Sequence, residues 1–194
     1  MTAPVLYLVR HGETDWNAQG RLQGGRDIPL NALGRVQAAA AARILKGLVR
    51  NPGTLDYVAS PLSRARETME ILRETLGLPA AEYRADERLV EIGFGEWEGL
   101  TWPEIRARDP ERAIAREADK WGYRPPGGES YADLLSRIAP AFGALARDTV
   151  VVSHGGVARA ALAHLCDHAP EQAPHMEIWQ GRVLVVQSRR WRWV

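Results

Sequence analysis

The stretch Leu8-Val9-Arg10-His11-Gly12-Glu13-Thr14-Asp15-Trp16-Asn17 begins with the last two residues of a short apolar run, residues 5–9. Runs of this length, rich in β-branched and aromatic residues, are typical of buried strands. Arg10 and His11 would then lie at the carboxyl end of the strand, where open α/β sheets bind their ligands. A guanidinium beside an imidazole suits an anionic substrate, with the histidine as base or nucleophile.

The same pattern recurs twice along the chain. Residues 57–59 precede Ser60-Pro61-Leu62-Ser63-Arg64, which we interpret as a helix entry with Ser60 as N-cap and Pro61 at the first helical position. Residues 149–152 precede Ser153-His154-Gly155-Gly156. If the three strands are parallel neighbours, their carboxyl ends meet and helix N-termini point into one crevice. The positive charge of the side chains, the paired donors of the arginine guanidinium and the dipole of the helix N-termini then predict a phosphate site. It would be made by Arg10, His11, Arg64 and His154.

Several motifs follow one another in a characteristic order. They are LVRHGETDWN at 8–17, RLQG at 21–24, DIPL at 27–30, SPLSRARET at 60–68, EIGFGEWEG at 91–99 and SHGGVAR at 153–159. In this order they resemble the histidine phosphatase superfamily, also called the phosphoglycerate mutase-like family. The resemblance implies an α/β fold of the phosphoglycerate mutase-like type, a three-layer α/β/α sandwich with a mostly parallel central sheet.

The resemblance also implies roles for individual residues. His11 is the expected nucleophile, which forms a phosphohistidine, while Arg10, Arg64 and His154 neutralise the phosphoryl oxygens. Contacts to the substrate or its phosphate are expected from a second group of residues: Thr14, Asn17, Gln23, Gly24 and Gly155. No cofactor and no metal are expected.

The leaving alkoxide needs a proton, which a carboxyl group must supply. Five glutamates compete for this role: Glu13, Glu87, Glu91, Glu96 and Glu98. In the family the donor precedes an aromatic-glycine pair by three residues, and Glu91 stands at that spacing before Phe94-Gly95. We therefore expect Glu91 to be the acid, with Glu87 as the alternative. Glu13 is expected to support the loop after the first strand.

Composition limits the class of protein. A chain of 194 residues fits one domain, and we expect 1–194 to form a single domain with an inserted lid region at about 96–128. The formal net charge of +1 offers no basic footprint for nucleic acid. Cys166 is the sole cysteine, which makes the cytoplasm the expected compartment. No apolar run approaches the ~20 residues that span a bilayer, so no membrane partner is expected.

A zinc site is the competing interpretation of one short segment. His164, Cys166 and His168 lie close together in the sequence, but no HExxH glutamate or further ligand set accompanies them. We interpret this segment as a solvated helix end.

Four further local predictions concern secondary structure. A helix beginning near Asn31 should bury the face formed by Val36, Ala40, Ile44 and Leu48. A third strand is expected within 83–90. Ser130 and Asp133 resemble a capping box. The tail should form a hairpin, with 177–179 joined through a Gln180-Gly181 turn to 183–186, followed by a last strand at 191–194.

The expected function is hydrolysis of a small phosphomonoester through phosphohistidine, by a monomer or homodimer. A cofactor-dependent phosphoglycerate mutase is the alternative, and a catalytically dead binding module is a third possibility. In the mutases Gly-Asn follows the second catalytic histidine, whereas here Gly155-Gly156 follows His154. Those mutases also carry an adjacent arginine pair in a longer insertion, and the present lid region has none. Both differences favour the phosphatase.

Overall fold

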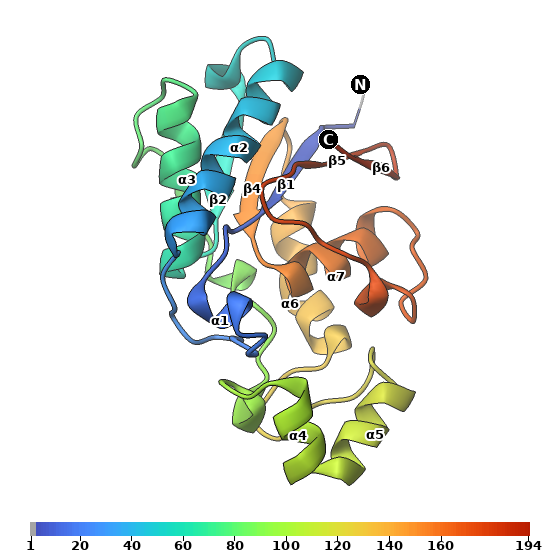
Figure 1. Cartoon of the computed structure of the whole chain (residues 1–194). Coiled ribbons are helices and arrows are strands. Elements are labelled where there is room, and N and C mark those ends of the chain that lie inside the picture. The colour runs from blue at the N-terminus through green and yellow to red at the C-terminus, as the bar shows by residue number, and fades with distance from the viewer. Residues whose placement is uncertain (1–2) are drawn as a thin grey trace.

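A mostly parallel sheet forms the centre of the computed structural model, which describes residues 3–194 (Figure 1). Its six strands lie in the order β3-β2-β4-β1-β5-β6. The first four in this order run parallel to one another. Strand β5 pairs antiparallel with β1, and β6 pairs antiparallel with β5. The strands are β1 (Leu6–Arg10), β2 (Asp56–Ala59), β3 (Arg84–Ala85), β4 (Thr149–Ser153), β5 (Leu184–Gln187) and β6 (Arg190–Trp193).

The register of the three central strands brings their carboxyl ends level. Arg10 of β1 lies opposite Ser153 of β4, and Ala59 of β2 lies opposite Val152. Main-chain bonds continue one residue further, because His11 N donates to the Ser153 carbonyl at 2.9 Å. The residues that follow the three strands therefore emerge at one edge of the sheet.

Helices cover both faces of the sheet, as Figure 1 shows. Tyr7 and Val9 pack with α2 (Ala32–Leu48) and α3 (Ser63–Thr75), whereas Leu6 and Leu8 pack with α6 (Tyr131–Gly143) and α7 (Gly155–Leu165). This alternation follows from the period of two residues in a strand whose faces are both buried. The three-layer α/β/α sandwich predicted from the sequence is confirmed.

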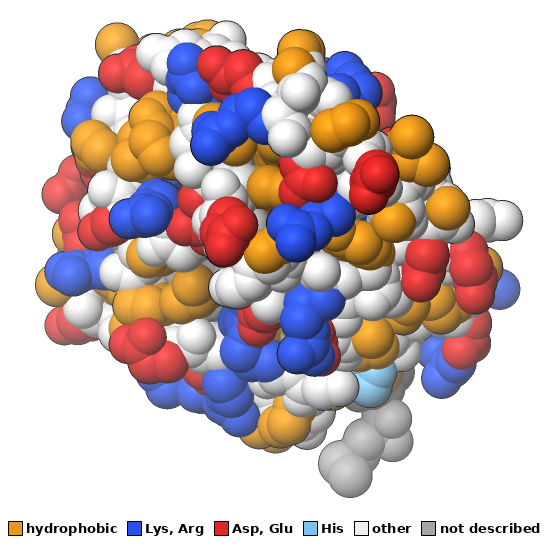
Figure 2. All heavy atoms as spheres, turned by 90° about the horizontal axis from the view of Figure 1, so that it is seen from below, with side chains coloured by type: hydrophobic (Ala, Val, Ile, Leu, Met, Phe, Trp, Pro, Cys, Tyr) orange, Lys and Arg blue, Asp and Glu red, His pale blue; other side chains and the backbone are white. Residues whose placement is uncertain are grey.

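The region between the third strand and α6 packs around a separate small cluster. Three short helices and four 3₁₀ turns complete the part of the chain that the structure describes: α1 (Asp15–Ala18), α4 (Trp102–Arg108), α5 (Pro110–Ala118), η1 (Pro52–Thr54), η2 (Glu87–Leu89), η3 (Gly95–Trp97) and η4 (Ala173–His175). Trp97, Ile105 and Ala113 are buried against one another at the centre of this cluster. Helices α4 and α5 lie beyond the carboxyl ends of β1 and β4 in Figure 1. Seen from that side, Lys and Arg side chains alternate with Asp and Glu over the surface (Figure 2).

The expected helix cap at Ser60 is wrong. Helix α3 begins at Ser63 with Leu62 as N-cap, and Leu62 makes no side-chain cap bond. Ser60 N instead donates to the Val152 carbonyl at 3.0 Å, so the backbone is still paired as an extended strand at that point. The capping box of Ser130 and Asp133 on α6 is confirmed.

The buried face of α2 also differs from the prediction. Val36 is 61% exposed, whereas Ile44 and Leu48 are partly buried against the core as expected. The most buried side chains of the helix are Ala38, Ala41, Ala42 and Leu45. Helix α2 packs against both the sheet and α3, and small side chains permit that close approach.

Two predicted strands are shorter than expected or missing. The third strand is limited to Arg84–Ala85, because Asp86 turns the chain by accepting a hydrogen bond from Arg88 N. The predicted hairpin around Gln180-Gly181 is wrong. The strands expected at 183–186 and 191–194 do form, as β5 and β6, and they pair with each other through a Ser188-Arg189 turn, both residues at positive φ (49° and 63°). Residues 177–179 form no strand, since the Ile178 carbonyl accepts from Arg10 instead. Within residues 3–194, no helix is long and apolar enough to cross a bilayer.

Candidate active site

The four side chains predicted to converge do lie together at the carboxyl edge of the sheet. His11, His154 and Arg64 are buried, with at most 2% of each exposed. The two imidazole rings meet edge to face with their centroids 5.1 Å apart. Strands β1 and β4 position the histidines, and the first turn of α3 positions Arg64.

The tautomer of His11 follows from one short hydrogen bond. Its Nδ1 lies 2.7 Å from the carbonyl oxygen of Gly12. Since a carbonyl oxygen only accepts, Nδ1 carries the proton and the lone pair is on Nε2. Gly12 packs against the backbone of Gly34, where an added Cβ would lie 2.1 Å from the Gly34 carbonyl oxygen. The loop that orients the ring therefore has no room for a side chain at this position.

The two arginines are held by main-chain carbonyls. Arg64 donates from Nη1 to Arg26 O at 2.6 Å and from Nη2 to Gly24 O at 2.9 Å. Arg10 donates from Nη1 to Ile178 O at 2.9 Å. Neither guanidinium is bound to a carboxylate by these bonds, so both retain their charge for another partner.

Three buried donors of the site have no partner among the residues that the structure describes. They are Nε of Arg10, Nε of Arg64 and Nδ1 of His154. Buried polar groups in folded proteins are rarely left unpaired, and such exceptions are typical of sites that bind a ligand. Unpaired nitrogens on two arginines and a histidine are the kind of groups that bind the oxygens of a phosphoryl group.

The environment keeps both histidines neutral. Burial, followed by the positive charges of Arg64 and Arg10, lowers the pKa of His11 well below its usual 6.5. Burial and the charge of Arg64 lower the pKa of His154 in the same direction. A neutral imidazole retains the lone pair that a nucleophile requires.

Glu91 lies beside these groups. Its Oε2 accepts from Gly156 N at 3.1 Å, in the first turn of α7, and its Oε1 accepts from Ile92 N at 3.0 Å. Burial lowers the pKa of the Arg10 guanidinium, and the nearby Glu91 carboxylate opposes that shift. A Cβ on Gly156 would lie 2.5 Å from Glu91 Oε1, so this approach requires glycine. Sequence reasoning named Gly155 and missed Gly156, although the double glycine was a visible signal.

The four competing glutamates lie elsewhere. Glu13 Oε1 accepts from Asn31 Nδ2 at 2.9 Å, which ties the loop after β1 to the start of α2. Glu98 accepts from Gly25 N at 3.1 Å and from Phe94 N at 3.2 Å, which joins two loops. Glu87 and Glu96 are exposed.

The residues expected to contact the substrate divide into two groups. Thr14 is buried and caps α1, where its Oγ1 accepts from Asn17 N at 3.1 Å. Asn17 Oδ1 accepts from Gln180 Nε2 at 3.2 Å, so both side chains support the loop. The other three belong to the surroundings of the arginines. Gly24 accepts from Arg64 through its carbonyl, and Gly155 is the first residue of α7 and lies beside Arg10. Gln23, next to Gly24, is 6% exposed, and its Oε1 has no partner in the described chain.

Ser60 is a contact that sequence reasoning missed. Its Oγ lies 2.8 Å from His154 Nε2, and both residues are fully buried. The serine was visible in the SPLSR motif, but its spacing to the helix favoured the interpretation as a cap.

A cavity of about 320 Å³ lies between α5 and the body of the protein. Its lining combines aromatic and cationic side chains: Leu22, Phe94, Trp102, Arg106, Arg116, Glu117, Lys120, Tyr131, Arg159 and Pro174. Arg159 lies on the side of the cavity next to Arg10, because a Cβ on Gly155 would lie 3.2 Å from Arg159 Nη1 and 3.6 Å from Arg10 Nε. Within residues 3–194, no group of three His, Cys, Asp or Glu side chains is placed to hold a metal ion.

Comparisons with known proteins identify the family of this chain. The family described as histidine phosphatase superfamily (branch 1) matches residues 6–194. Glucosyl-3-phosphoglycerate phosphatase of Mycobacterium tuberculosis is 40% identical over an alignment of 179 positions, which covers 85% of this chain and 76% of that protein. The 6-phosphofructo-2-kinase/fructose-2,6-bisphosphatase of Gallus gallus is 36% identical over 178 residues, or 91% of this chain, and the chain spans only 36% of that relative's length.

A solved structure has the same fold. Mycobacterial glucosyl-3-phosphoglycerate phosphatase in complex with VO3 superposes with a TM-score of 0.83 at 35% identity, covering 99% of this chain and 98% of that one. The match in sequence runs almost from end to end, and the fold agrees with it. The chain therefore belongs to the histidine phosphatase superfamily, branch 1.

Proposed function

We propose that this protein hydrolyses a small phosphomonoester through a phosphohistidine on His11, without a metal ion. The observation that carries the proposal is the buried, neutral histidine pair between Arg10 and Arg64, with three unpaired donors around it. The relatives at 40% and 36% identity carry phosphatase names, which supports the reaction class.

The first step transfers the phosphoryl group to the protein. His11 Nε2 attacks phosphorus in line with the leaving oxygen, and the P–O bond breaks as the N–P bond forms. Arg10 Nε, Arg64 Nε and His154 Nδ1 donate to the three non-bridging oxygens and stabilise their charge. Protonated Glu91 gives its proton to the leaving oxygen, which departs as an alcohol.

The second step returns the protein to its starting state. The Glu91 carboxylate takes a proton from water, whose oxygen attacks phosphorus, and the N–P bond breaks. Inorganic phosphate leaves, His11 regains its lone pair on Nε2, and Glu91 is protonated again.

The adjacent cavity indicates the kind of substrate. Arg116, Lys120 and Arg159 supply positive charge, while Phe94 and Trp102 supply flat apolar surface. This combination favours a phosphate ester with a second anionic group next to a ring such as a sugar. Glucosyl-3-phosphoglycerate and fructose 2,6-bisphosphate, the compounds in the relatives' names, both fit this description.

The proposal extends to organisation and location. Residues 1–194 form one domain in which 96–128 cover the phosphate site as a lid, since the cavity lies between this region and the body. The protein acts in the cytoplasm as a monomer or homodimer, in keeping with its single cysteine, Cys166.

A phosphate-release screen over phosphorylated metabolites tests the function. The wild type should release phosphate from a subset of anionic sugar and acid phosphates, and exhaustive chelation should leave the rate unchanged. The His11→Ala variant serves as the matched blank. Equal release by wild type and variant, or loss of turnover on chelation that a divalent ion restores, would contradict the proposal.

A further inference from the structure

The segment that carries Glu91 has little support from regular secondary structure. Residues 90–94 lie between η2 and η3 and belong to no helix or strand of the described chain. A general acid must nevertheless keep its carboxyl at a constant distance from the leaving oxygen, because a misplacement of about 1 Å can cost on the order of 100-fold in rate. Some other group must therefore hold this segment in place.

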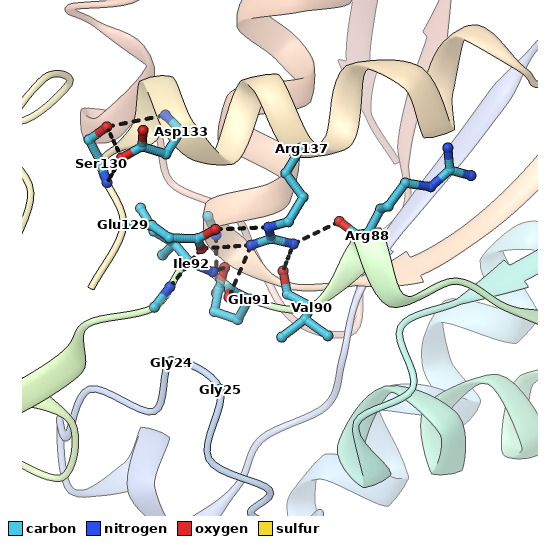
Figure 3. A network of polar contacts seen from close by, with 12 residues as sticks. Gly24, Gly25, Arg88, Val90, Glu91, Ile92, Glu129, Ser130, Asp133 and Arg137 are labelled. Carbon is cyan, nitrogen blue, oxygen red and sulfur yellow. Dashed lines mark hydrogen bonds and ion pairs between the residues drawn. The ribbon is translucent and has the colours of Figure 1, made fainter. Parts of the chain in front are cut away.

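Arg137 of α6 binds the main chain before Glu91 and at Glu91 itself (Figure 3). Its Nη1 donates to Arg88 O at 2.8 Å and to Val90 O at 2.9 Å, and its Nη2 donates to Glu91 O at 3.4 Å. Ser153, next to His154, donates from Oγ to Leu89 O at 2.8 Å. Four consecutive carbonyls, 88 to 91, thus accept bonds from side chains that belong to α6 and β4.

Glu129 fixes Arg137 in turn. Arg137 Nε donates to Glu129 Oε1 at 2.9 Å, and Nη2 donates to Oε2 at 2.7 Å. Glu129 also accepts from Gly93 N at 3.0 Å and donates from its own N to Gly93 O at 2.8 Å. The pair therefore holds the chain both before and after Glu91, as the dashed lines of Figure 3 show.

The fork geometry of arginine is needed for this arrangement. A guanidinium has five N–H donors in one plane, and Arg137 directs all five to the acceptors just named. A lysine ammonium would place three donors on a single nitrogen and could not reach the carboxylate and all three carbonyls together.

We propose that Arg137, held by Glu129, is the positioning residue for the general acid. It sets the main chain at Glu91, and Gly156 N then orients the carboxyl. Arg137 contacts neither the substrate nor the reacting atoms. The inference rests on the proposed function, in which Glu91 protonates the leaving oxygen.

The Arg137→Lys variant tests the proposal with two classes of ester. Turnover of an alkyl phosphate, which needs the proton, should fall on the order of 100-fold. Turnover of p-nitrophenyl phosphate, whose leaving group departs with little help, should stay within a factor of about three. Arg124→Lys is the matched control. Arg124 is exposed and pairs with Asp133 of α6, the helix that carries Arg137, but it bonds to none of residues 88–91. Both rates should therefore be unchanged.

A double mutant separates positioning from general stability. In a Glu91→Gln background, Arg137→Lys should lower alkyl phosphate turnover no further, because the proton donor is already absent. Equal losses on both esters, or a full additional loss in the double mutant, would overturn the inference while leaving the proposed function intact.

The folded state of each variant is checked by thermal unfolding. If Arg137→Lys does not fold, Glu129→Gln is measured in its place and should show the same selective loss. A wild type that releases phosphate from neither ester would instead overturn the proposed function, and this inference with it.

Discussion

Ser60 Oγ and His154 Nε2 lie 2.8 Å apart in a fully buried contact that joins the end of β2 to the start of α7. Ser60 Oγ also lies 3.4 Å from Leu62 N, which donates to it. When the serine hydroxyl donates to Nε2, the proton of the ring is on Nδ1, the atom that has no partner in the described chain. In that tautomer Nδ1 can donate to a phosphoryl oxygen, while the serine hydroxyl keeps Nε2 paired.

Replacement of this serine tests the arrangement. Ser60→Ala leaves Nε2 buried and unpaired, and we expect kcat to fall about tenfold, equivalent to about 1.4 kcal/mol. Vanadate should bind more weakly to the same extent. Ser63→Ala is the control, because Ser63 belongs to the same SPLSR motif but its Oγ donates to Asp27 and not to His154. An unchanged vanadate affinity in Ser60→Ala would argue against a role for this contact.

The nucleophile can be identified directly. His11→Ala should lower turnover on the order of 10⁴-fold or more, because the step that forms the covalent intermediate is lost. His11→Asn should be equally inactive and should retain the wild-type fold. During turnover the wild type should carry phosphate that is labile to acid and stable to base, whereas acid-stable phosphate, as on serine, would overturn the assignment.

The role of Glu91 depends on the leaving group. Glu91→Gln should slow alkyl phosphates by about 10²- to 10⁴-fold and aryl phosphates far less, because only the former need a proton from the protein. Glu87→Gln, an exposed position close in sequence, should behave as the wild type. The Brønsted dependence of kcat on leaving-group pKa is the measurement, and an equal slope in Glu91→Gln and the wild type would contradict the role.

Stability should depend on pH through the two buried histidines. Burial and the neighbouring arginines lower the folded-state pKa of both below 6.5, so the unfolded chain binds protons that the folded protein does not. The free energy of unfolding should therefore fall as the pH drops below 6.5, by up to about 1.4 kcal/mol per pH unit for each histidine.

Chemical denaturation at pH 7.5, 6.5 and 5.5 measures this dependence. His154→Asn should show a shallower slope, whereas His164→Gln, which alters an exposed histidine, should retain the wild-type slope. A slope that is unchanged in His154→Asn would show that the buried histidine does not titrate as described.

Water rather than a second substrate oxygen should receive the phosphoryl group. The cavity holds Arg106, Arg116, Lys120 and Arg159, but the lid region contains no adjacent arginine pair to retain a phosphorylated product. Interconversion of 3-phosphoglycerate and 2-phosphoglycerate, primed with 2,3-bisphosphoglycerate, should be slower than phosphate release in the same assay. Faster interconversion would favour the mutase.

The sequence alone was sufficient for the two central strands that carry the histidines. The runs before Arg10 and before His154 are short and apolar, and both proved to be central parallel strands. The pattern predicts that the two histidines converge if the strands are parallel neighbours, and the parallel pairing of β1 with β4 meets that condition. Family motifs then singled out Glu91 from five candidates, and the structure places it beside Gly156.

Contacts between distant polar groups were decided only by the tertiary structure. Ser60 has the composition and spacing of a helix cap, yet it faces His154, 94 residues away in the sequence. The sequence pattern predicts only that Arg137 is one arginine of an amphipathic helix. In the structure its side chain binds carbonyls 46 to 49 residues away in the sequence. Local spacing predicts where a backbone turns and which face is apolar. The partner of a polar side chain depends instead on which atoms the packed fold brings within about 3 Å. Local spacing does not predict that distance, because the two atoms belong to segments far apart in the sequence.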